Sequence, residues 1–206
     1  AQTENVALTP GSDAADLNFS WYSAGKGTPA VKVWKDGSKS SAKVVTGNAE
    51  SISAENWQGK SYSAANKVNI ADYFEENTQY HYQYTDNYTG DDSVWSAEYD
   101  YTTKATDKFS VILTGDPQVG ASGSSSDKSA NDASVARDAY NWNKTMQQAL
   151  KTCPDASFLL SAGDQINQSG AAKDDDKKTR ESEYAGYLYP SVFRSLPIAA
   201  TIGNHD

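Results

Sequence analysis

The sequence predicts two domains in series, an all-β sandwich over residues 1–105 and an α/β domain over residues 106–206. The first half is rich in Tyr, Trp, Ser and Thr, and its short runs alternate between apolar and polar residues, as half-buried strands do. The second half has longer apolar runs separated by stretches of helical spacing. The composition changes near Lys104, and 206 residues are enough for two small domains with separate cores.

Short strands follow one another through the first half. Leu17, Phe19 and Trp21 alternate with polar residues, and Asp36-Gly37 predicts a turn that joins two strands. Further strand positions are Val6, Leu8, Ala30, Val31, Val33, Trp34, Tyr62, Ala64, Val68, Ile70, Tyr80, Tyr82, Tyr84, Trp95, Tyr99 and Tyr101. About seven strands with turns between them indicate a sandwich like those of immunoglobulin and fibronectin type III domains, in which Tyr80 would be the corner tyrosine.

The aromatic residues of this half admit two interpretations. We expect most of them to form the core of the sandwich, and His81, which alternates with tyrosines, to lie on the polar face. An exposed strip of aromatic side chains could instead bind glycan.

Three apolar segments of the second half predict buried strands of a parallel sheet, over residues 109–113, 158–160 and 197–202. An apolar pattern from Ala133 to Leu150 predicts a helix between them, capped by Asn131 or Asp132 and ended before Pro154.

A second helix is predicted over residues 182–195, after a solvated charged segment at residues 173–180. Pro190 is a candidate kink in this helix. The residues expected to face inward are Tyr184, Leu188, Val192 and Phe193.

Polar residues follow each of the three predicted strands. Asp116 and Asp164 each follow a glycine, and the third strand leads into the sequence GNHD at residues 203–206. The carboxyl ends of parallel strands meet at one edge of a sheet, where functional groups gather. Carboxylate and amide oxygens with a nearby imidazole suit divalent metal ions that activate water. A single Gly-Asp pair is an ordinary turn, but the ordered series ending in GNHD is a much stronger pattern.

At these residues the sequence resembles the calcineurin-like metallophosphoesterases, whose motifs run D-x-H, G-D-x-x-(D/E or Y), G-N-H-(D/E), and later a single His and G-H-x-H. The matching segments are DPQ at 116–118, GDQIN at 163–167 and GNHD at 203–206, of which the last is complete. A fibronectin-like domain ahead of the catalytic domain is similar to the arrangement in purple acid phosphatases. The resemblance thus extends over nearly the whole chain, and residues 106–206 would be the first half of the phosphoesterase domain.

The resemblance implies a role for each matching residue. Asp116 would bind the first of two metal ions, Asn204 the second, and Asp164 would bridge both. His205 would stabilise or protonate the leaving oxygen, and Asp206 would orient His205 by accepting its other ring proton. The reaction would be the hydrolysis of a phosphate ester by in-line attack of a metal-activated hydroxide on phosphorus.

Gln118 and Asn167 depart from the family pattern, because better-known members carry a histidine at the first position and an acid or a tyrosine at the second. Each amide would bind the first metal through its oxygen or only hydrogen-bond to bound water. The two metal ions could be Fe, Mn, Zn or Mg, since an oxygen-rich site with imidazole accepts all of them. The later histidine motifs would follow Asp206, so we expect residues 1–206 alone to be inactive.

The charge and composition of the chain exclude some classes of partner and indicate where the protein is located. A net charge of −9 argues against binding a nucleic-acid backbone, and no apolar run is long enough to cross a bilayer. The single cysteine, Cys153, rules out an intrachain disulfide. Together with the surface composition, this favours an exported bacterial protein, secreted or at the cell surface with its signal peptide removed. The sequence leaves the ester and the oligomeric state open.

A noncatalytic function is the alternative. In it, the sandwich of a cell-surface protein binds glycan or protein and the phosphoesterase half is degenerate. Gln118 and Asn167 are the residues that favour it.

Overall fold

The computed structural model describes residues 5–123, 128–168 and 174–206. Contacts divide the chain into two units, the first made of Ala1–Ile52, Tyr62–Ser110 and Arg194–Ile198, and the second of Ser53–Ser61, Val111–Phe193 and Ala199–Asp206. A domain boundary at residue 105 stays a prediction. Within the described ranges, no helix has the length and apolar character needed to cross a membrane.

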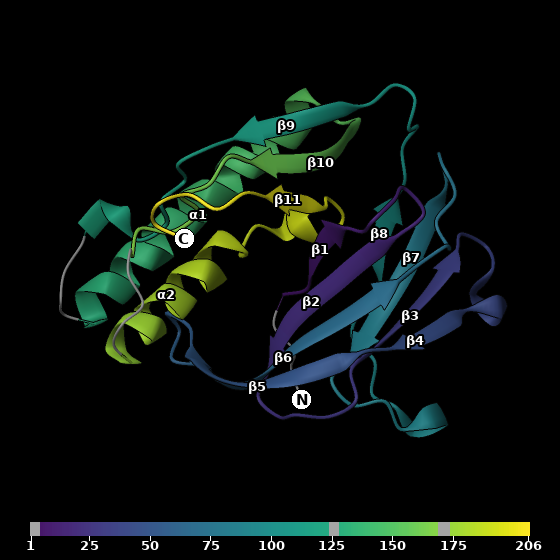
Figure 1. The fold of residues 1–206 in the computed structure, drawn as a ribbon, viewed down its shortest axis with the longest axis horizontal. Coiled ribbons are helices and arrows are strands. Elements are labelled where there is room, and N and C mark those ends of the chain that lie inside the picture. Colours follow the sequence, from purple (N-terminus) through teal and green to yellow (C-terminus); the bar gives the residue numbers. More distant parts are fainter. Residues whose placement is uncertain (1–4, 124–127, 169–173) are drawn as a thin grey trace. The chain divides into compact units, whose positions relative to one another are not determined.

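The first unit is a β-sandwich-like arrangement of two four-stranded sheets (Figure 1). One sheet has the order β1 (Ala7–Pro10), β2 (Leu17–Ser23), β6 (Ser61–Ile70) and β5 (Asn48–Glu55). The other has the order β4 (Lys43–Thr46), β3 (Ala30–Lys35), β7 (Gln79–Thr85) and β8 (Tyr99–Thr102). The pairs β1–β2, β2–β6, β3–β4, β3–β7 and β7–β8 are antiparallel. Three of them, β1–β2, β3–β4 and β7–β8, join strands that follow one another in the chain, as antiparallel pairing allows.

Aromatic side chains fill the core of this unit, as predicted. Tyr80, Tyr82 and Tyr84 of β7 are buried, and the ring of Phe19 on β2 meets that of Tyr82 edge to face at 5.1 Å. The alternation of β2, buried at every second residue, is the pattern that predicted it. Aromatic packing of this kind contributes large buried areas per residue.

Tyr80 has the contacts expected of a corner tyrosine. Its hydroxyl accepts a hydrogen bond from the backbone N–H of Glu75 at 2.8 Å and donates one to the carbonyl of Tyr73 at 3.4 Å. The tyrosine at the start of β7 therefore holds the preceding corner of the chain.

Some expectations for this half are wrong. Strand β5 was not predicted, because only one of its side chains is buried and its sequence shows no apolar alternation. The two strands predicted to be joined at Asp36-Gly37 are confirmed as the pair β3 and β4, but their connection is longer than a tight turn and contains the 3-10 turn η1 (Lys39–Ser41). Trp95 precedes β8 and is not part of it.

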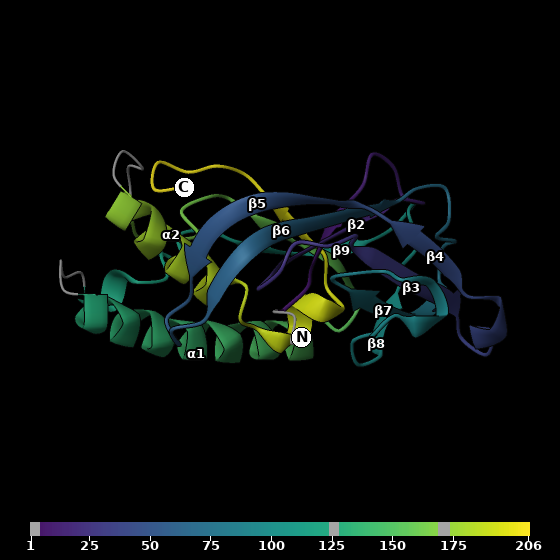
Figure 2. The same ribbon diagram turned by 90° about the horizontal axis from the view of Figure 1, so that it is seen from below.

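In the second unit, helices α1 (Lys128–Thr152) and α2 (Asp174–Tyr187) lie side by side (Figures 1 and 2). The accompanying sheet has the order β11 (Ile198–Ala200), β10 (Ala156–Ser161) and β9 (Ser110–Thr114), with β9 and β10 pointing the same way in Figure 1. The rings of Trp142 and Tyr187 stack at 5.7 Å, and the Trp142 indole N–H donates to the Tyr187 carbonyl at 3.0 Å. This α/β arrangement agrees with the predicted fold class.

The predicted helices differ from the observed ones at their ends. Helix α1 begins at Lys128, and Ala133 and Ala136 are exposed, whereas Val135, Ala139, Trp142 and Met146 form the buried face. Helix α2 begins at Asp174, inside the segment 173–180 that was predicted to be solvated. Lys173, the first residue of that segment, lies outside the described residues. Helix α2 ends before Pro190, which precedes the 3-10 turn η4 (Ser191–Arg194), because proline cannot donate the hydrogen bond that would continue the helix.

The first and third strands of this sheet are less buried than predicted. Phe109, Val111 and Leu113 are 56%, 38% and 67% exposed, and Ile202 is 86% exposed. Strand β9 is an edge strand, so only one of its sides pairs with a neighbour in the described sheet. Strand β11 covers only Ile198–Ala200. Leu159 of the central strand is fully buried, as predicted.

Candidate functional site

The loops that follow β9 and β10 run side by side. The backbone N–H of Asp116 donates to the carbonyl of Gly163 at 3.2 Å, and that of Gln118 donates to the carbonyl of Asp164 at 3.0 Å. Val119 and Ile166 then form a parallel bridge. The first two motifs therefore continue the pairing of their strands, which places the backbones of Asp116 and Asp164 on neighbouring turns.

Left-handed backbone conformations gather in these turns. Asp116, Gln118 and Asp164 have φ of 51°, 38° and 53°, and they are three of the five non-glycine residues with positive φ in the described ranges. This conformation costs about 1–2 kcal/mol per residue and is rare for a side chain such as that of glutamine. Strain of this kind persists where surrounding hydrogen bonds enforce it, and it is common at functional sites.

The third motif wraps around Asp164. The backbone N–H of His205 donates to Oδ1 of Asp164 at 3.0 Å. A Cβ on Gly203 would lie 2.0 Å from the same oxygen, so only glycine allows this approach. The sequence GNH is thereby fixed against the carboxylate of the second motif.

Asp164 is ionised in this environment. The backbone N–H of His205 lowers the pKa of Asp164 most, against an opposing effect of burial, and hydrogen bonding from the Gln118 side chain lowers it further. The backbone of His205 and the side chain of Gln118 therefore stabilise the negative charge of Asp164 where the three loops meet.

His205 has a defined tautomer. Its Nδ1 lies 2.5 Å from the backbone carbonyl of Asn167. A carbonyl oxygen only accepts hydrogen bonds, so Nδ1 carries the proton and Nε2 of the neutral ring keeps its lone pair. This arrangement makes Nε2 the nitrogen available for chemistry.

The expected contact between Asp206 and the His205 ring is wrong. The carboxylate of Asp206 accepts three backbone N–H groups, those of Asp164 at 2.7 Å, Gln165 at 2.9 Å and Gly203 at 2.9 Å. Backbone donors are plentiful in these tight turns, and they satisfy both oxygens of Asp206. Asp206 therefore ties the second and third motifs together, and the Asn167 carbonyl takes the role that the sequence had suggested for Asp206.

Three further residues support the loops and were not among the predicted site residues. Gln165 is buried, and its amide donates to Ser161 Oγ at 3.0 Å and to the Thr201 carbonyl at 2.9 Å. Tyr184 Oη lies 3.5 Å from Asp206 Oδ1, and burial and then the charge of Asp206 raise the pKa of Tyr184. Burial raises the pKa of Glu183 to about 7. Gln165 could have been found from its place inside the second motif, whereas the acidic pattern of the helix gives no sign of Glu183.

The donors expected to hold metal ions are all oxygens. Asp116 and Asn204 are exposed, Asp164 is buried, and Gln118 and Asn167 are partly buried. Two carboxylates and three amide oxygens form a hard donor set, which fits Mg²⁺ or Mn²⁺ better than softer ions. Because only two of these residues are acidic, histidine donors from elsewhere would be needed to complete a site for Zn or Fe.

One group of acidic residues in the described chain is close enough to hold an ion by itself, and it lies in the first unit. Asp13, Asp16 and Asp72 converge there. Asp16 already accepts from Ser12 Oγ at 2.6 Å and from the N–H of Asp72 at 2.9 Å, and Asp13 accepts from the N–H of Ala15 at 2.8 Å. These bonds hold a loop, and the group is separate from the three motifs.

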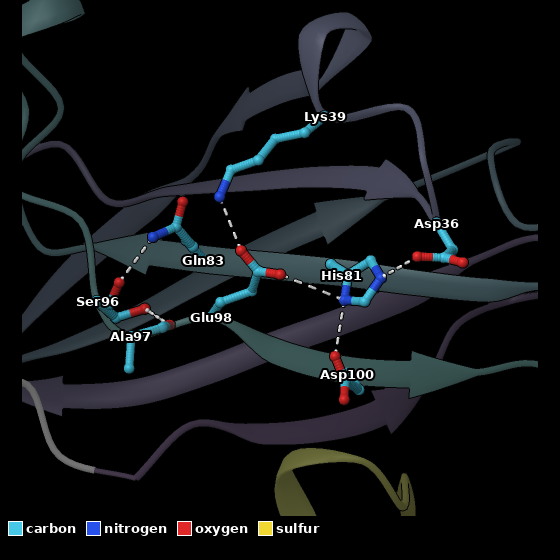
Figure 3. Close-up of polar contacts among 8 residues, drawn as sticks. All are labelled: Asp36, Lys39, His81, Gln83, Ser96, Ala97, Glu98 and Asp100. Atoms are coloured by element: carbon cyan, nitrogen blue, oxygen red, sulfur yellow. Dashed lines mark hydrogen bonds and ion pairs between the residues drawn. The ribbon is translucent and has the colours of Figure 1, made fainter.

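The other histidine of the chain, His81, lies in the first unit (Figure 3). His81 Nδ1 is 2.7 Å from Asp100 and 3.4 Å from Glu98, and Nε2 is 2.9 Å from Asp36. Burial lowers the pKa of His81, but the hydrogen bonds to Asp36 and Asp100 raise it by more, so that it lies above the ordinary value. His81 faces away from the core, as predicted, with both ring nitrogens in contact with carboxylates.

This chain is similar to known proteins in fold and not in sequence. No protein-family model matches the sequence, and no curated protein is similar to it in sequence. Purple acid phosphatase PPD1 from yellow lupin (Lupinus luteus) seeds matches with a TM-score of 0.62 and 16% identity, over 97% of this chain and 35% of that chain. The chain therefore has a fold similar to that part of the phosphatase. This similarity concerns the fold alone, and the chain spans 35% of the length of that phosphatase.

A second solved structure is the sensor domain of the anti-sigma factor RsgI4 in Pseudobacteroides cellulosolvens. It matches with a TM-score of 0.32 and 20% identity over 53% of this chain and 96% of that chain. A score this low supports no argument about the fold.

Proposed function

We propose that the full-length protein hydrolyses phosphate esters with the help of two metal ions. The observation that carries the proposal is the convergence of three strand-end loops on the ionised carboxylate of Asp164. Bound metal ions would supply the charge that activates water and stabilises the phosphoryl group. The similar fold of a purple acid phosphatase supports the proposal.

Each residue of the site has a part in this proposal. Asp116 and Asp164 would hold one ion with the amide oxygens of Gln118 and Asn167, and Asp164 and Asn204 would hold the other. His205 would act on the leaving oxygen through Nε2, because its Nδ1 is already bonded to the Asn167 carbonyl. To stabilise or protonate that oxygen, the ring would first take up a second proton at Nε2, which the imidazolium form then donates. Asp206 would keep the second and third motifs in register through its three backbone contacts.

The wider assignments belong to the same proposal. The first unit would be a fibronectin type III-like domain over residues 1–105, supported by its two antiparallel sheets and by the corner contacts of Tyr80. Residues 106–206 would form the first half of the phosphoesterase domain, and the protein would be bacterial and exported. The metals would be drawn from Mn, Mg, Zn and Fe.

The experiment is hydrolysis of p-nitrophenyl phosphate by the full-length protein in the presence of Mn²⁺, with wild type compared with Asp164→Asn. Asparagine keeps an acceptor oxygen for the His205 N–H but removes the charge shared by both ions, so we expect turnover to fall to background. Asp92→Asn, at an exposed position of η2 (Gly90–Asp92), is the matched control and should keep full activity.

An Asp164→Asn protein that keeps wild-type turnover and wild-type metal content would contradict the bridging role of Asp164. A wild type with no turnover of monoester or diester at any metal concentration would favour the noncatalytic alternative, in which the sandwich binds glycan or protein.

A further inference from the structure

Glu183 lies fully buried on α2, beside the loop of the second motif. Its Oε2 accepts hydrogen bonds from the backbone N–H of Gln168 at 2.7 Å and of Asn167 at 3.1 Å. A carboxylate that accepts two N–H groups inside a protein forms stronger hydrogen bonds than a neutral acceptor would. The side chain is therefore a fixed anchor for residues 167 and 168.

The first motif closes on the same carboxyl group. Gly120 has φ of +106°, and a Cβ there would lie 2.3 Å from Oε1 of Glu183. Asp138 on α1 holds this glycine in place by accepting its N–H at 2.9 Å. Glu183 thus contacts the loops of both motifs, and only glycine at position 120 leaves room for it.

The peptide between Asn167 and Gln168 links Glu183 to His205. Its N–H is the group that Glu183 binds at 2.7 Å, and its carbonyl is the group that His205 Nδ1 binds at 2.5 Å. In a planar trans peptide these two groups point in opposite directions, so fixing the N–H also fixes the carbonyl. A negative charge on the N–H side polarises the peptide and makes the carbonyl a better acceptor.

We propose that Glu183 is a positioning residue that acts through the Asn167–Gln168 peptide to hold the Nδ1 proton of His205, so that Nε2 is presented for reaction. The use made of Nε2 rests on the proposed phosphoesterase function. The tautomer itself does not, and it can be measured without any turnover.

The test is the ¹⁵N NMR spectrum of the imidazole rings in the labelled 206-residue chain. The chain has only two histidines, so His81→Asn assigns the remaining signal to His205. At about pH 8.5, well above the ordinary pKa of histidine, a neutral ring reports its tautomer directly. We expect wild-type His205 to be protonated at Nδ1.

The variants are a matched pair at position 183. Glu183→Met keeps an unbranched side chain of similar length but removes the acceptor, and we expect His205 to lose its preference for Nδ1–H. Glu183→Gln keeps an acceptor oxygen and should keep the tautomer. Glu181→Met makes the same change two residues earlier on α2 and should leave the His205 signals unchanged.

Three results would overturn the proposal. One is a wild-type His205 protonated at Nε2, and another is a folded Glu183→Met chain with an unchanged His205 tautomer. If Glu183→Met does not fold, the comparison of wild type with Glu183→Gln decides. The glutamine amide is a weaker acceptor than the carboxylate, so in Glu183→Gln the signals of the Gln168 amide proton and of the His205 Nδ1 proton should both move upfield. The third overturning result is a shift of the Gln168 signal without a shift of the His205 signal, which would exclude coupling through the peptide.

The outcomes for Glu183 and for the proposed function are distinct. A correct tautomer response in a protein that hydrolyses no phosphate ester would leave the positioning role intact and reject the phosphoesterase. An active enzyme with an unresponsive tautomer would reject only the role of Glu183.

Discussion

The two histidines of the chain have opposite surroundings. His81 in the first unit has carboxylates at both ring nitrogens, from Asp36, Glu98 and Asp100. His205 in the second unit has a backbone carbonyl at Nδ1 and backbone contacts that fix its loop. A ring with both nitrogens engaged can stabilise a fold but has no free atom for a substrate, whereas a ring held at one nitrogen can do chemistry with the other. Residue type alone does not separate these roles.

The largest effect on turnover should come from replacing the His205 ring by an amide, with the same kind of replacement at His81 as the comparison. In the full-length protein, His205→Gln should lower kcat by about 10²–10⁴-fold, the usual contribution of a positioned acid or base. His81→Asn is the comparison and should leave kcat unchanged, since it lies in the first unit. Steady-state kinetics with p-nitrophenyl phosphate measure both, and an equal loss in the two variants would mean that the contrast between the histidines is not catalytic.

Metal binding by the 206-residue chain should be weak, with no hydrolysis at an enzymatic rate. Its three motifs supply two carboxylates and amide oxygens, and the histidine ligands implied by the resemblance would come from later motifs. Titration calorimetry with Mn²⁺ measures the affinity, with Asp164→Asn and Asp92→Asn as a matched pair. Two tight sites on this chain would show that it already holds a complete donor set.

A smaller effect is expected on the pH dependence of stability. The pKa of His81 is raised in the folded state, so its ion pairs stabilise the protein below its unfolded pKa of about 6.5, and this stabilisation is lost as pH rises through the folded pKa. Because Asp36 and Asp100 are largely exposed, we expect the contribution to be about 1 kcal/mol.

Denaturant unfolding of wild type and His81→Asn between about pH 5.5 and 9 measures this contribution. The wild type should be the more stable protein at the acid end of this range, and the difference should shrink toward the alkaline end. A difference that grows with pH would mean that the ring is held neutral.

The sequence predicted the features that depend on local pattern. The alternation of Leu17, Phe19 and Trp21 gave β2, and the three Gly-Asp or GNHD turns identified the loops that meet. It did not predict β5, of whose side chains only one is buried, or the start of α2 in a charged segment. Nor could it show that Asp206 would bind backbone N–H groups, since that choice depends on the paths of two separate loops, those of the second and third motifs.

The polar supports of the site illustrate the same limit. Glu183 is one of several acidic residues in its region of the sequence, yet it is fully buried and holds the second motif. Burial of a carboxylate follows from tertiary packing and from the two N–H groups that it satisfies, and neither is visible in a linear pattern. The identities of the metal ligands stay a prediction.

The most direct measurement of the central claim is metal removal and return in the full-length protein. Chelation with EDTA followed by gel filtration should abolish hydrolysis of p-nitrophenyl phosphate, and added Mn²⁺, Zn²⁺, Mg²⁺ or Fe²⁺ should restore it in wild type but not in Asp164→Asn. Hydrolysis that survives complete metal removal, or that returns equally in the Asp164→Asn variant, would contradict a metal-dependent site built on the three loops.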